Sequence, residues 1–72
     1  MTTLTPEQEE WEATMGKATG LLVLMLDAGL SIEVAVDLTV DYYTGRGLVP
    51  SERADNETIL TAFAVEKGGK DG

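Results

Sequence analysis

The sequence predicts a small all-α domain of three helices, at about residues 6–28, 32–44 and 52–67. Two patterns support this fold class: helix-capping residues precede each segment, and apolar residues recur at intervals of three and four along the first of them. We expect the whole chain of 72 residues to form one domain, which would bury only ~60% of the surface that its unfolded chain exposes. Because so small a core is marginally stable, we expect oligomerisation to complete it.

The first helix has signals at both ends. Thr5 is a favourable N-cap, Pro6 suits the first helical position, and Gln8 completes a capping box. At the other end, Gly29 is expected to stop the helix, with Leu30 placed for the apolar contact of a Schellman motif. Between these ends, one apolar face is predicted from Trp11, Met15, Ala18, Leu22 and Met25.

The second segment fits two templates. Along residues 32–42, apolar residues alternate with polar or small ones, which is the pattern of a half-buried strand. On a helical wheel, the same residues place Glu33, Asp37 and Asp41 on one narrow stripe. We favour a helix, because a serine N-cap follows a glycine corner and because a lone strand would have no partner. An α+β fold with residues 32–42 as a strand is the alternative.

The third helix follows a loop at residues 45–50 that contains two glycines and a proline. Ser51 or Asp55 is expected to cap its start, and Lys67 lies near its end, before a Gly-Gly pair. Residues 68–72 are expected to form a short polar tail. The apolar face of this helix is predicted from Ile59, Leu60, Ala62, Phe63 and Val65.

The composition excludes much of the chemistry that enzymes use. The chain has 13 Asp and Glu against 5 Lys and Arg, a formal net charge of −8, and neither Cys nor His. It therefore cannot form a disulfide, a common structural zinc site, a thiolate nucleophile or an imidazole general base. A chain this short can also hardly enclose a ligand cleft of ~300 Å³ or more by itself. We therefore expect neither enzymatic activity nor a bound cofactor.

The acidic charge also limits the partners. Five cations are too few to follow a phosphate backbone, so we expect no direct binding to nucleic acid. The longest charge-free stretch of the apolar region, residues 18–26, is far short of the ~20 residues that span a membrane, and the charge disfavours an anionic membrane surface. We expect a cytoplasmic protein, or a virion component if its source is viral, with a composition similar to that of proteins from salt-loving organisms.

Three carboxylates form the sharpest candidate site: Glu33, Asp37 and Asp41, spaced one helical turn apart. Oxygen ligands suit Ca²⁺ or Mg²⁺, but a helix face supplies poor cage geometry and the sequence contains no calcium-binding loop. We therefore predict no metal site. The stripe is expected to be a solvated acidic face, with docking of a basic partner as the alternative.

Gly16 and Gly20 would allow another backbone to approach the first helix closely, either from a later helix of the same chain or from a second subunit. The chain also has more apolar side chains than three short helices can bury, since residues 21–26 are apolar on every side of the first helix. We therefore predict that apolar surface is shared with a copy or with another protein. The residues predicted to bind that partner are Trp11, Met15, Leu22, Met25, Tyr42 and Tyr43.

These patterns predict a small acidic protein–protein interaction or assembly module, whose partner is a second copy or another protein. Small proteins of this kind are common among viral and phage structural or accessory proteins. The alternative is an acidic mimic of nucleic acid that inhibits a basic DNA- or RNA-binding protein. In favour of the mimic, residues 1–42 carry 8 acids and 1 base, a formal charge of −7, whereas residues 43–72 carry 5 acids and 4 bases, a formal charge of −1.

Overall fold

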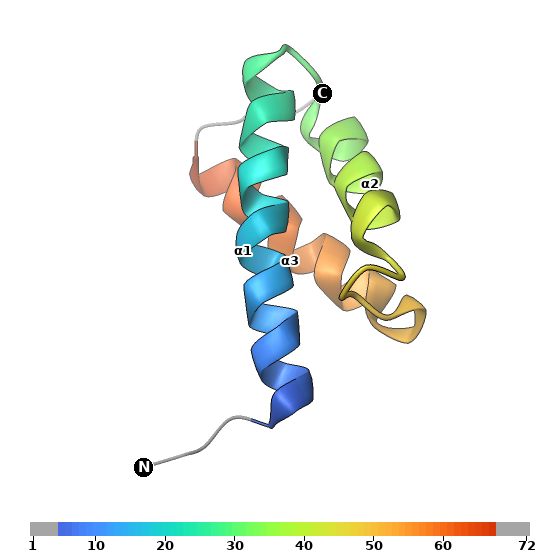
Figure 1. Ribbon diagram of the computed structural model, residues 1–72. Coiled ribbons are helices and arrows are strands. Elements are labelled where there is room, and N and C mark those ends of the chain that lie inside the picture. The colour runs from blue at the N-terminus through green and yellow to red at the C-terminus, as the bar shows by residue number, and fades with distance from the viewer. Residues whose placement is uncertain (1–4, 68–72) are drawn as a thin grey trace.

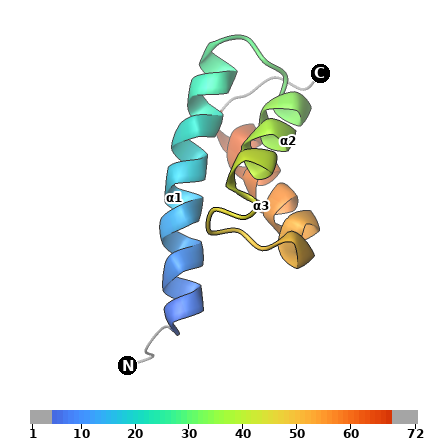
Figure 2. The same cartoon turned by 45° about the vertical axis from the view of Figure 1, so that its right-hand side comes forward.

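The computed structural model describes residues 5–67, which form three α-helices and one short 3₁₀ helix. The elements are α1 (Pro6–Asp27), α2 (Ile32–Tyr43), the 3₁₀ helix η1 (Pro50–Glu52) and α3 (Arg53–Glu66). α1 and α2 lie side by side and run in opposite directions, and α3 crosses behind them (Figures 1 and 2). The all-α prediction is confirmed, and the alternative with residues 32–42 as a strand is wrong. The predicted polar tail, residues 68–72, lies outside the described residues.

Side-chain caps start the first two helices. The Thr5 backbone N–H donates to Gln8 Oε1 at 3.2 Å, and the Gln8 N–H donates to Thr5 Oγ1 at 3.1 Å, which completes the predicted capping box. At the start of α2, the Val34 N–H donates to Ser31 Oγ at 3.3 Å. These bonds join residues three apart, so the local sequence is enough to specify both helix starts.

α1 ends in the Schellman motif that Gly29 and Leu30 predict. The Leu30 N–H donates to the Met25 carbonyl at 3.1 Å, and the Gly29 N–H donates to the Leu26 carbonyl at 3.0 Å. Gly29 has a φ of 99°, in the left-handed region that a residue with a Cβ rarely adopts. The chain can therefore reverse within four residues and place α2 against α1.

The α2 segment is a helix because its alternating pattern also gives a continuous helical face. Its buried residues recur at intervals of three and four, and its acids lie on the exposed side. α2 packs against both α1 and α3, so this face is covered along its length. The buried residues of α2 are Ile32, Ala35, Val36, Thr39 and Val40.

The core gathers apolar side chains from all three helices and from the loop before η1. Met15, Ala18 and Leu22 confirm the predicted apolar face of α1, with Trp11 and Met25 packed at its margins. The remaining buried apolar residues are Ile32, Ala35, Val36, Val40, Leu48, Leu60 and Ala64.

The predicted features of α3 are partly wrong. Its buried residues are Asn56, Leu60 and Ala64, spaced four apart, whereas Ile59 and Val65 are 44% and 53% exposed. The face of α3 that packs against α2 and α1 is therefore not its richest apolar stripe. The start is also different: α3 continues directly from η1 without a side-chain cap, so neither of the two predicted capping residues has that role.

The loop between α2 and η1 docks on α1 through Gly47 and Leu48. Leu48 is 1% exposed and inserts into the core. Gly47 has a φ of 124°, and a Cβ built on it would overlap the hydroxyl group of Thr14, itself buried in α1. Glycine is therefore required here for two reasons, backbone conformation and close approach. Figure 2 shows this loop reaching from the end of α2 toward α1.

Candidate functional site

The residues predicted to bind a partner are mostly used by the chain itself. Met15 and Leu22 are 7% and 0% exposed and lie in the core, so in this conformation they offer no surface to a partner. Trp11, Met25 and Tyr43 are partly buried and pack against that core. The sixth residue, Tyr42, is 52% exposed.

Gly16 and Gly20 do not pack against another helix of this chain. Both are exposed, and a Cβ built on either would meet no atom within 4 Å. The predicted close crossing within the chain is therefore wrong, because α2 and α3 cover the opposite side of α1. A crossing with a second subunit at these glycines stays a prediction.

Three apolar side chains form a stripe along the exposed side of α2. Val34, Leu38 and Tyr42 are spaced four apart, so they lie on one helix face, and they are 45%, 44% and 52% exposed. We call this stripe the outer face of α2. At its end, the Arg46 guanidinium lies 4.5 Å from the centroid of the Tyr42 ring, and the same guanidinium donates to the Tyr42 carbonyl.

The acidic stripe of α2 meets a cation from α3. Arg53 places its Nη1 2.6 Å from Asp41 Oδ1, its Nη2 2.9 Å from Asp37 Oδ1 and its Nε 3.1 Å from Glu57 Oε2. We call these four residues the Arg53 cluster. Hydrogen bonding to Asp41, followed by the charges of the neighbouring acids, raises the pKa of Arg53 above its ordinary value. One guanidinium therefore holds three carboxylates and joins two helices.

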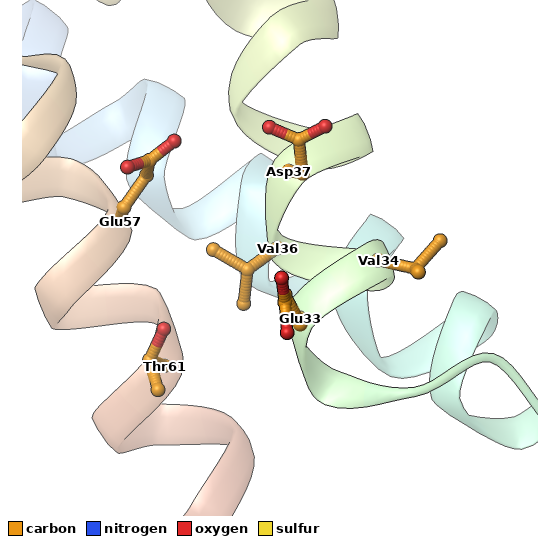
Figure 3. Close-up of a pocket in the computed structure, with 6 residues that line it drawn as sticks. All are labelled: Glu33, Val34, Val36, Asp37, Glu57 and Thr61. Atoms are coloured by element: carbon orange, nitrogen blue, oxygen red, sulfur yellow. The ribbon is translucent and has the colours of Figure 1, made fainter. Parts of the chain in front are cut away.

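An open hollow of about 450 Å³ lies between α2 and α3 next to this cluster. Figure 3 shows Asp37 and Glu57 facing each other from the two helices, and Val34 pointing away from α3. Glu33 also lines the hollow, so the predicted acidic face borders it. Within residues 5–67, no group of three or more acids is arranged to hold a metal ion.

A second acidic region surrounds Trp11. Two hollows, of about 340 and 540 Å³, both have Trp11 and Glu52 in their walls. The first also has Asp55 and the second has Glu7 and Glu10. We call these residues, together with Asn56 in the wall of the smaller hollow, the Trp11 cleft. None of its four acids takes part in an ion pair with another residue of the described part of the chain.

A buried amide joins the two sides of the Trp11 cleft. The Trp11 indole Nε1–H donates to Asn56 Oδ1 at 2.9 Å, which links α1 to α3 across 45 residues of sequence. An indole nitrogen can only donate, so this bond fixes the orientation of the amide. Asn56 is 1% exposed, and its Nδ2 has no hydrogen-bond partner among residues 5–67. A buried donor in this state costs free energy, and buried polar groups are usually satisfied by a protein group, an ordered water or a bound group.

Comparisons with known proteins found no relative of this chain. No family model matches the chain, and neither does any curated protein or solved structure. Among residues 5–67, no helix is both long enough and apolar enough to cross a membrane.

Sequence reasoning missed Asn56 and Arg53. Both act between helices, and neither belongs to a motif. The available signals were indirect: a tryptophan packed near a core needs an acceptor for its N–H, and two aspartates one turn apart suit a guanidinium.

Proposed function

We propose that this protein is a protein–protein interaction module that docks a partner on the outer face of α2. The observation that carries the proposal is the exposure of Val34, Leu38 and Tyr42, each close to half exposed, on a helix whose opposite face is already buried in the chain's own core. An aligned stripe of large apolar side chains on a charged protein is characteristic of a docking surface.

The charges beside this stripe favour a different protein over a second copy as the partner. Glu33, Asp37 and Asp41 follow the same helix, next to the outer face. With Arg53 and Glu57 they give four carboxylates and one guanidinium, a formal charge of −3. Two copies packed through this face would bring like charges together, whereas an apolar surface bordered by Lys and Arg would be complementary.

The alternative function, mimicry of nucleic acid, has less support. A mimic presents free carboxylates in place of phosphates, but in the acidic stripe of α2 both Asp37 and Asp41 already pair with Arg53. The two functions also differ in their response to salt. Apolar docking survives at about 1 M salt, where screening shortens the range of charge interactions to ~3 Å, and binding through acids does not.

The test compares two variants that place the same charge on similarly exposed apolar positions. Leu38→Glu lies in the outer face of α2, and Val65→Glu lies on α3, where the side chain is 53% exposed. Far-UV circular dichroism first establishes that both variants fold. Tagged wild-type and variant proteins then capture partners from the producing cells at about 0.15 M and about 1 M NaCl.

We expect one protein to be captured by the wild type and by Val65→Glu at both salt concentrations and to be lost with Leu38→Glu. Equal capture by the two variants would overturn the assignment of the face. Loss of the captured protein at high salt would instead favour the mimic. The remaining possibility is that a second copy of the chain occupies the face, and light scattering on the purified protein tests it. A dimer that Leu38→Glu dissociates would show that a second copy occupies the face.

A further inference from the structure

We propose that the Trp11 cleft binds an arginine side chain of a partner protein. The cleft shares no residue with the outer face of α2, so this site goes beyond the function proposed above. Three features of the cleft support the proposal: acids without an ion pair among residues 5–67, a partly exposed tryptophan, and an amide donor without a partner in the same part of the chain.

The acids of the cleft require a positive ligand. Glu7 and Glu10 come from the first turns of α1. Glu52 is the last residue of η1, and Asp55 lies in the first turn of α3. Their formal charge is −4, and no Lys or Arg of residues 5–67 lines either hollow. Like charges gathered on low-dielectric walls concentrate the negative potential there and attract cations.

The aromatic ring favours a guanidinium over other cations. Trp11 is partly buried, and it lines both hollows. A planar guanidinium stacks on an indole face and keeps its five N–H donors free for carboxylates at its edge. The Arg53 cluster shows that helices of this chain can surround one guanidinium with three carboxylates.

The Asn56 amide indicates that the ligand also carries a hydrogen-bond acceptor. Its oxygen is occupied by the Trp11 indole, Asn56 lines the smaller hollow, and its buried Nδ2 has no partner among residues 5–67. A peptide supplies both groups that the cleft lacks, a backbone carbonyl for Nδ2 and a guanidinium for the acids. A simple metal or ammonium ion supplies no such acceptor.

The experiment uses the full-length protein and the fluorescence of Trp11, which is the only tryptophan in the sequence. The probes are capped glycine pentapeptides with Arg, Lys or Gln at the centre. We expect the Arg peptide to change the emission saturably, the Lys peptide to bind more weakly and the Gln peptide to have no effect. In nitrogen-15 NMR spectra, the Asn56 side-chain amide signals should shift with the Arg peptide.

A matched pair of double variants separates the cleft from the general charge of the protein. Glu52→Gln with Asp55→Asn removes two acids of the cleft, and Asp27→Asn with Glu66→Gln removes two exposed acids that line none of the three hollows. We expect the first pair to weaken binding of the Arg peptide about tenfold and the second pair to weaken it less than about twofold. Equal weakening by both pairs, or equal binding of the Arg and Gln peptides, would overturn the proposal.

Discussion

The Arg53 cluster and the Trp11 cleft both gather acids where two helices meet, but only the cluster includes its own cation. In the cluster, Arg53 lies within 3.1 Å of Asp37, Asp41 and Glu57. The cleft holds four acids, and none of them is in an ion pair within residues 5–67. A net charge of −8 therefore says little about where unpaired acids lie, because ion pairs within the fold neutralise some acids and leave others free.

The largest effect on stability is expected from changing Gly47, which lines the larger hollow of the Trp11 cleft and takes no part in the Arg53 cluster. Gly47→Ala combines an unfavourable φ with an overlap on Thr14, so we expect it to lower the free energy of unfolding by about 3 kcal/mol. Gly45→Ala is the control: its φ is also positive, at 89°, but its Cβ would meet open space, and we expect a loss of about 1 kcal/mol. Urea unfolding followed by circular dichroism measures both, and equal losses would contradict the close contact with Thr14.

A smaller loss is expected from Trp11→Phe, which removes the hydrogen bond across the cleft. The change leaves both polar atoms of the buried Asn56 amide without a partner, and we expect a loss of about 2 kcal/mol. Adding Asn56→Leu removes the stranded amide, so the double variant should be more stable than the sum of the two single changes predicts. Additive losses in urea unfolding would show that the indole and the amide are not coupled.

On the exposed side of α1, opposite the core, substitutions of glycine should raise the free energy of unfolding rather than lower it. Gly16→Ala and Gly20→Ala place a methyl group in open space within a helix, and each should raise the free energy of unfolding by about 0.5–1 kcal/mol. Thermal unfolding measures the gain. If the protein forms dimers and either change dissociates them, the predicted crossing with a second subunit at these glycines gains direct support.

The smallest effects on stability are expected from removing single charges. The melting temperature should shift in opposite directions for the Arg53 cluster and for the Trp11 cleft. Asp41→Asn removes an ion-pair partner of Arg53 and should lower the melting temperature, whereas Glu10→Gln relieves repulsion in the cleft and should raise it. Both shifts should shrink at about 1 M NaCl. Shifts of the same sign would mean that the cleft acids are paired after all.

The pH dependence of the Arg53 cluster follows from the direction of the shift. A raised pKa means that the contribution of Arg53 to stability is fully present below its unfolded-state pKa and is lost only as the pH rises through the higher, folded-state value. From pH 6 to pH 9, well below both values, Arg53 should therefore cause no change in the melting temperature. A melting temperature that falls in this interval for the wild type but not for Arg53→Met would contradict that assignment.

The sequence by itself determined the local features of the fold. The capping box at Thr5, the serine cap of α2 and the Schellman motif at Gly29 were all predicted and are all present. The apolar face of α1 was also predictable, because its intervals of three and four repeat over several turns. The caps and the Schellman motif depend on contacts between residues at most five positions apart, so a short segment of sequence is enough to specify each of them.

The packing of the helices determined which of their residues are buried and which acids are paired. It selected Asn56 rather than Ile59 for the interior, buried Leu48 from a loop, and left Gly16 and Gly20 uncovered. It also divided the acids into a paired and an unpaired group, through contacts such as the Arg53–Asp37 bond, which joins residues 16 positions apart. Burial and charge pairing depend on how three helices cross, and several crossings satisfy the same local signals. The sequence therefore determined the helices, and their packing decided which groups are left for a partner.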